Sequence, residues 1–150
     1  MSDPDITHEA MKTFSFCAAH RVAPHKGKCR YLHGHNYKVE VHARWHRLNE
    51  KGMVIDFSDL MGIANGEIMP KFDHTTILHD EDPLLELLME APDEIPMTLQ
   101  TTPNPPTAEV IAHEILKIYR EKLPQESAEN CEVFKVVVWE TPTCCGVAQC

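Results

Sequence analysis

The pattern of apolar and polar residues predicts two strands in the first third of the chain. Residues 11–17 alternate in character over a short run, and residues 37–45 alternate throughout. The apolar positions of the second run are Tyr37, Val39, Val41, Ala43 and Trp45, and its polar positions are Lys38, Glu40, His42 and Arg44. Such alternation is typical of half-buried antiparallel strands. We expect two strands joined by a long loop and preceded by a flexible leader over residues 1–10.

Helical spacing replaces the alternation after a turn at residues 49–52 and a short predicted strand at 53–55. The apolar residues that recur at this spacing are Phe57, Leu60, Met61, Ala64 and Ile68. They predict one amphipathic helix, which should end at Pro70 because proline cannot donate the backbone hydrogen bond that a helix interior requires.

Residues 79–106 form an acidic, proline-rich segment that reads as an insertion. Asp82 and Pro83 are suited to cap and begin a short Leu-rich helix within it. Five prolines follow at positions 92, 96, 103, 105 and 106. They predict irregular structure from the end of this helix up to Thr107.

The C-terminal third predicts a long helix and a further strand. Thr107 is a helix cap, and the apolar stripe that follows it should end near Pro124. Residues 132–139 are rich in β-branched side chains and place Phe134, Val136 and Val138 on one strand face. Glu140 continues that face, and a carboxylate at the end of a buried stripe needs a partner. The elements together predict a single α+β domain.

Composition limits the classes of function. A chain of 150 residues with 43% hydrophobic residues can bury one core of ordinary size. The formal charge of -9 argues against nucleic-acid and anionic-membrane partners. An apolar run of the roughly 18 residues needed to cross a bilayer is missing from the sequence, and its first ten residues are polar and acidic. We therefore expect a cytoplasmic protein whose six cysteines stay reduced.

One segment of this acidic chain is basic. Residues 11–39 contain six basic side chains and no acidic one. They are Lys12, Arg21, Lys26, Lys28, Arg30 and Lys38. A local basic patch can steer a small anion such as a phosphorylated substrate into a cleft. A solvated loop with a chance bias of charge explains the same pattern, and the pattern alone leaves both readings open.

The chain contains ten histidines, and His33-Gly34-His35 is the most informative pair among them. In an extended segment, residues i and i+2 point to the same side about 7 Å apart, so both imidazoles can face one ion. His20, at the end of the first strand, can supply a third ligand. Three protein ligands leave one position of a zinc ion open, which is the catalytic pattern. Spacing alone leaves His25, His42 and His46 as rival ligands, although His42 and His46 read more simply as surface residues.

Two further positions carry candidate chemistry. Cys29 lies among basic residues, where positive charge favours the thiolate, so it suits a general base; a zinc ligand or an inert core thiol fits its position equally well. Asp73 and His74 can act as a carboxylate-oriented imidazole for proton transfer. Adjacent residues rarely pair face to face, so an ordinary polar turn is the competing interpretation.

Six motifs occur in order along the chain: F-x-x-A-H, C-x-x-x-H-G-H-N-Y, G-x-V-x-D-F, D-H, P-T-x-E and E-T-P-T. They occupy residues 16–20, 29–37, 52–57, 73–74, 106–109 and 140–143. From about residue 11 to residue 145 the chain thereby resembles the family of 6-pyruvoyl-tetrahydropterin synthase and 6-carboxy-tetrahydropterin synthase. The resemblance implies the tunnelling fold, a four-stranded antiparallel sheet with two helices on one face in ββααββ order. It also implies a homo-oligomeric ring, commonly a hexamer of two trimers face to face, with active sites at subunit boundaries.

The resemblance also implies roles for residues of this chain. Zn²⁺ would be held by His20, His33 and His35. Cys29 would be the general base, Asp73 and His74 a proton relay, and Glu140 the anchor for the pterin ring, because a carboxylate suits a guanidine-like N–H edge. The P-T-x-E motif adds Thr107 and Glu109 as substrate-binding residues.

Spacing within the second motif separates two branches of the family. Three residues lie between Cys29 and His33, which resembles the carboxy-tetrahydropterin branch of the queuosine and deazapurine pathway; the pyruvoyl branch usually has two more. The implied reaction is the lyase conversion of 7,8-dihydroneopterin triphosphate to 6-carboxy-tetrahydropterin, acetaldehyde and triphosphate. The alternatives are a pyruvoyl synthase, an aldolase acting on unphosphorylated dihydroneopterin, and a non-catalytic zinc- or pterin-binding module. Charge alone suggests Arg21, Lys26, Lys28 or Arg30 for the triphosphate.

Overall fold

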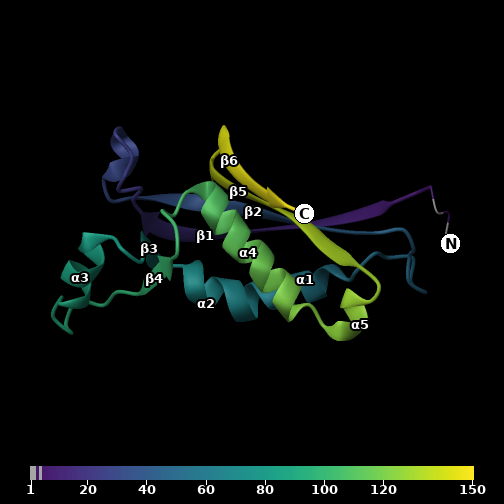
Figure 1. The fold of residues 1–150 in the computed structure, drawn as a ribbon. Coiled ribbons are helices and arrows are strands. Elements are labelled where there is room, and N and C mark those ends of the chain that lie inside the picture. The colour runs from purple at the N-terminus through teal and green to yellow at the C-terminus, as the bar shows by residue number, and fades with distance from the viewer. Residues whose placement is uncertain (1–2, 4) are drawn as a thin grey trace.

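The computed structural model describes residue 3 and residues 5–150 and places a layer of helices on one face of a twisted sheet (Figure 1). In this part of the chain the sheet has six strands in the order β4-β3-β1-β2-β5-β6. Their bounds are β1 His8–His20, β2 His33–Trp45, β3 Thr75–His79, β4 Leu99–Thr102, β5 Glu132–Thr141 and β6 Cys144–Gln149. The predicted α+β class is confirmed.

The sheet differs from the predicted four antiparallel strands by two strands at one edge. Strands β1, β2, β5 and β6 pair antiparallel as expected. Strand β3 pairs parallel with β1, and β4 pairs parallel with β3. Pro96 and Pro103 lie on either side of β4 and outside it. The prediction that the proline-rich segment is irregular throughout is therefore wrong. Strand β1 also begins at His8, earlier than the predicted start at residue 11.

The predicted helix before Pro70 continues beyond that proline. Helix α1 (Phe57–Ile63) runs through a π-helical turn, η2 (Ala64–Ile68), into α2 (Met69–Phe72). Pro70 lies in the first turn of α2, directly after the π-helical turn. Residues 53–55 form an irregular bend, so the short strand predicted there is wrong.

The remaining helices begin where the sequence predicts. Helix α3 (Pro83–Met89) is capped by the Asp82 carboxylate, which accepts a 2.9 Å hydrogen bond from the Leu84 N–H. Helix α4 (Ala108–Lys122) is capped by Thr107 and crosses the sheet (Figure 1). A short α5 (Gln125–Ala128) follows, and a 3-10 turn η1 (Lys28–Arg30) interrupts the loop between β1 and β2. In the part of the chain that the structure describes, no helix combines the length and apolar character that crossing a membrane requires.

The core lies between the sheet and the helices. Two side chains that belong to predicted apolar faces lie outside it. Phe57 belongs to the predicted apolar stripe of α1 but is 52% exposed, because it is the first residue of the helix. Phe134 leaves the face of Val136 and Val138 because the pairing of β2 with β5 shifts by one residue beside His42. His42, predicted to lie on the surface, is buried, and its imidazole contacts the Glu9 and Glu40 carboxylates.

A buried ion pair fastens the acidic insertion to the end of β1. The Asp82 carboxylate is fully buried, and Arg21 binds it through both Nε, at 2.8 Å, and a terminal guanidinium nitrogen. The Arg21 guanidinium holds the pKa of the Asp82 carboxyl below its usual range. Because Arg21 directly follows His20, this pair fixes the insertion beside the predicted metal site.

Replacing Arg21 with glutamine should lower the free energy of unfolding by about 3 kcal/mol, because the Asp82 charge would stay buried without its partner. Urea denaturation measures the change. Arg44→Gln is the matched control, because its partner Glu132 is well exposed, and it should cost under about 1 kcal/mol. Equal losses in the two variants would contradict the structural role of the buried pair.

Candidate metal centre

The two longest strands bring the three predicted histidines together. His20 ends β1 and lies opposite His33, the first residue of β2. His35 projects to the same side as His33 because side chains alternate along a strand. Gly34 permits the close approach of the strands, since a Cβ there would lie 3.0 Å from the Ala18 carbonyl oxygen. One ligand atom from each imidazole lies within 4.8 Å of the other two, so all three can bind a single ion.

Backbone carbonyl groups orient two of the three rings. The Nδ1–H of His20 donates to the Pro106 carbonyl at 2.7 Å, and the Nδ1–H of His33 donates to the Tyr31 carbonyl at 2.6 Å. These bonds leave the Nε2 lone pair of each ring free, as in metal-binding histidines. The buried Nε2 atoms of His20 and His35 have no hydrogen-bond partner among the described residues. Such orphaned nitrogens indicate a missing ligand.

Burial favours the neutral, metal-binding form of two of the imidazoles, those of His20 and His35. Desolvation lowers the pKa of His20 to about 4, against the opposing effect of its bond to Pro106. Desolvation also lowers the pKa of His35. Three imidazole nitrogens, which would leave the fourth position of a zinc ion open, suit zinc in a catalytic site. The residues present therefore fit the zinc ion that the sequence predicts.

The lowered pKa of His20 predicts an acid-sensitive metal-free protein. Below pH 6.5 the unfolded chain binds a proton that folded His20 accepts only near pH 4. The stabilisation from neutral His20 is therefore complete above pH 6.5 and declines as the pH falls, by about 3 kcal/mol in total. Denaturation of the metal-free protein across this range should show a steeper loss than in the His20→Gln variant. Parallel profiles would contradict the buried neutral imidazole.

Glu140 enters the same site from β5. Its Oε1 lies 3.7 Å from His20 Nε2, so the carboxylate that the strand pattern left without a partner faces the histidines. The Tyr37 hydroxyl is buried there without a hydrogen-bond partner among the described residues. Burial and the nearby Glu140 charge raise the pKa of Tyr37, which stays protonated.

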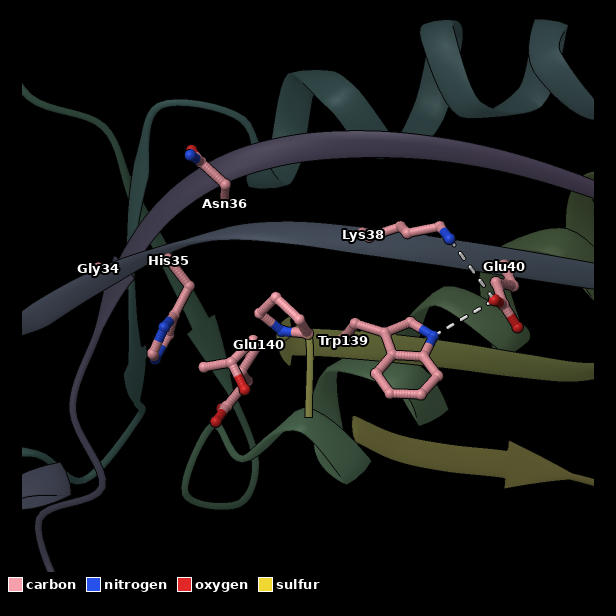
Figure 2. A pocket seen from close by; sticks show the side chains of 9 residues that line it. Gly34, His35, Asn36, Lys38, Glu40, Trp139 and Glu140 are labelled. Carbon is pink, nitrogen blue, oxygen red and sulfur yellow. Dashed lines mark hydrogen bonds and ion pairs between the residues drawn. The ribbon is translucent and has the colours of Figure 1, made fainter. Parts of the chain in front are cut away.

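A cavity of about 730 Å³ opens beside the histidines, where β2 and β5 separate beyond the Lys38–Trp139 pair. Figure 2 shows His35 and Glu140 together at one end of it and Lys38, Glu40 and Trp139 at the other. The Trp139 indole N–H donates to Glu40 at 3.3 Å. The volume suits a small organic ligand. The sequence places Lys38 in the basic patch but assigns no site role to Glu40 or Trp139; the position of Trp139 beside Glu140 was the available signal.

Asp73 and His74 form the pair that the sequence left undecided. The His74 Nδ1–H donates to Asp73 Oδ2 at 2.8 Å, while Asp73 Oδ1 accepts the Cys17 backbone N–H at 2.9 Å. The Cys17 bond, followed by the contact with His74, holds the pKa of the Asp73 carboxyl below its usual range. The His74 side chain is 82% exposed. The pair lies against Cys17, on the same strand as His20, with the His74 Nε2 directed away from the carboxylate.

The loop between β1 and β2 carries Cys29 and the predicted anion-binding residues. Cys29 is half-buried in the turn η1, and its carbonyl accepts the Val22 N–H at 2.8 Å. It is not part of the three-histidine ligand group found among the described side chains. The basic residues Lys26, Lys28 and Arg30 are exposed, whereas Arg21 is occupied by Asp82.

The P-T-x-E residues lie at the start of α4. The Thr107 hydroxyl accepts the Val110 N–H at 3.3 Å and so acts as the helix cap. Glu109 is exposed in the first turn. Strand β6 packs closely here, since a Cβ on Gly146 would lie 2.3 Å from the Glu109 nitrogen. Pro106 connects this motif to the metal centre through its bond to His20, but the structure brings neither Thr107 nor Glu109 into the histidine cluster.

Comparison with known proteins agrees with this arrangement. A family model described as 6-pyruvoyl tetrahydropterin synthase matches residues 9–149. The chain belongs to the 6-pyruvoyl tetrahydropterin synthase family. A Rickettsia bellii relative named 6-carboxy-5,6,7,8-tetrahydropterin synthase is 34% identical over 134 residues, which cover 89% of this chain and 94% of the relative. A Haemophilus influenzae relative of the same name is 33% identical over 135 residues, covering 88% of this chain and 92% of the relative.

Solved structures share the family fold. An uncharacterised protein from Wolinella succinogenes superposes with a TM-score of 0.81 at 25% identity, covering 97% of this chain and 99% of that one. The 6-pyruvoyl tetrahydropterin synthase of Plasmodium vivax superposes with a TM-score of 0.74 at 23% identity, covering 96% and 98%. The predicted family, tunnelling fold and enzymatic nature of the chain are confirmed.

Proposed function

We propose that this pterin synthase family member is a zinc-dependent carbon–carbon lyase. It would convert 7,8-dihydroneopterin triphosphate and one water molecule to 6-carboxy-5,6,7,8-tetrahydropterin, acetaldehyde and triphosphate. We place this reaction in the cytoplasm, as a step towards queuosine and other 7-deazapurines. The observation that carries the proposal is the cluster of His20, His33 and His35, whose ligand atoms lie within 4.8 Å of one another. The relatives named 6-carboxy-5,6,7,8-tetrahydropterin synthase support the choice of product.

The chain's own residues would bind and orient the substrate around this centre. His20, His33 and His35 would hold a zinc ion, which when bound acts as a Lewis acid towards the side-chain hydroxyls of the substrate. Glu140 lines the cavity at the same end as His35 (Figure 2), and its carboxylate could accept two N–H groups from the guanidine-like edge of a pterin. The cavity then leaves room for the ring between β2 and β5.

Proton transfer would fall to Cys29 and His74. The His74 Nδ1–H donates to the Asp73 carboxylate, so the Nε2 of His74 is free to accept a proton. Cys29 belongs to the loop that joins the metal ligands His20 and His33. His74 is largely exposed in a single chain. The family resemblance suggests a homo-oligomer, a hexamer of two trimers, in which a neighbouring subunit would cover this side chain.

The products of purified zinc-loaded protein test the proposal. Given 7,8-dihydroneopterin triphosphate, the protein should release acetaldehyde and form the 6-carboxy product. A product that keeps all three side-chain carbons would instead show a pyruvoyl synthase. Equal turnover of unphosphorylated dihydroneopterin would show an aldolase, and binding without turnover would show a non-catalytic module.

A further inference from the structure

The acidic insertion contacts His74, whose backbone is unusual. His74 is the one described non-glycine residue with a positive φ, at 56°. A histidine in this region is less stable than in an ordinary conformation and persists where its surroundings fix it. The His74 N–H donates to the Cys17 carbonyl at 2.6 Å, which fixes the peptide unit before the residue. The peptide unit that follows His74 must be fixed by a second contact.

Thr98 supplies that contact from the insertion. Its hydroxyl donates to the His74 carbonyl oxygen at 2.7 Å. Thr98 is itself fixed, because its carbonyl accepts the Thr76 N–H at 2.9 Å immediately before β4 begins. Its hydroxyl oxygen also lies 3.1 Å from that of the buried Thr75. The pairing of β3 with β4 therefore places the Thr98 hydroxyl next to the His74 carbonyl oxygen.

We propose that Thr98 is a positioning residue for His74. By holding the His74 carbonyl, it keeps the backbone at positive φ and the imidazole directed at Asp73, where the 2.8 Å bond fixes the ring. The acidic insertion then has a role in the site through a residue that touches neither substrate nor metal. This inference rests on the proposed function in so far as His74 moves a proton in the reaction.

Two nearly isosteric variants test the inference. Thr98→Val removes the hydroxyl and should lower kcat roughly fivefold, the effect of losing one hydrogen bond, while KM and zinc content stay unchanged. Thr98→Ser keeps the hydroxyl and should retain a kcat within about twofold of wild type. In a His74→Ala background, Thr98→Val should cause no further loss, because Thr98 acts only through His74.

A readout independent of turnover separates this inference from the proposed function. The ring resonances of His74 in ¹H–¹³C NMR spectra should shift in Thr98→Val and return to wild-type positions in Thr98→Ser. Absence of lyase activity in wild type would overturn the proposed function and leave this comparison intact. Unchanged His74 resonances in Thr98→Val, or an equal loss of kcat in the His74→Ala background, would overturn the inference.

Discussion

Replacing Cys29 with alanine is expected to lower the lyase rate about 10³-fold while zinc stays bound. The reason is that metal binding and proton transfer are assigned to different residues of the site. The metal ligands are the three histidines, and Cys29 lies outside this group, in the turn η1 of the loop that joins two of them. A general base can therefore be removed without removing a ligand. Acetaldehyde release and zinc content measured on the same preparation check both halves of the prediction.

Cys150→Ala provides the matched control for this variant. Cys150 is exposed, follows β6, and donates its amide N–H to the Phe134 carbonyl. Its replacement should leave the rate and the zinc content unchanged. Loss of zinc from Cys29→Ala would instead make this cysteine a ligand. A rate equal to wild type would remove it from the reaction altogether.

Replacing His20 with alanine should abolish tight zinc binding and, with it, turnover. His20 is the fully buried member of the cluster, with 1% of its surface exposed, and its ring is fixed by the Pro106 carbonyl. Loss of a direct ligand should exceed the about 10- to 100-fold weakening typical when an outer partner of a ligand is lost. Competition with a chromophoric chelator measures the zinc affinity of each variant.

His46→Ala is the control, because spacing alone made His46 a rival ligand. The structure places its exposed ring beside Trp45, away from the three-histidine group. This variant should bind zinc as wild type does. Weakening in His46→Ala that matched His20→Ala would show that the cluster has been assigned to the wrong histidines.

The elements that the sequence predicts well are those whose pattern has a local cause. Strict alternation locates β2, and the extended H-G-H segment directs His33 and His35 to one side because side chains in a strand repeat every two residues. The caps of α3 and α4 follow from Asp82 and Thr107, whose side chains accept backbone N–H groups at 2.9 and 3.3 Å. The same pattern does not choose the third histidine, because His20 meets His33 only through the pairing of β1 with β2.

The features that the sequence does not predict depend on contacts between distant segments. Strand β4 has four residues and no alternation of its own, and it exists because β3 offers it a parallel partner. The cavity forms where β2 and β5 part, so no local pattern marks Glu40 as a lining residue. The pairing of His74 with Asp73 depends on a positive φ that the Cys17 and Thr98 contacts maintain.

The central claim is that His20, His33 and His35 share one metal ion, and crystals grown with zinc test it most directly. Diffraction data collected on both sides of the zinc absorption edge should show one anomalous peak per chain, about 2.0 Å from a nitrogen of each ring. A fourth position should remain open on the side of the cavity that Glu140 lines. Three rings turned away from one another, with no anomalous peak between them in excess zinc, would contradict the account.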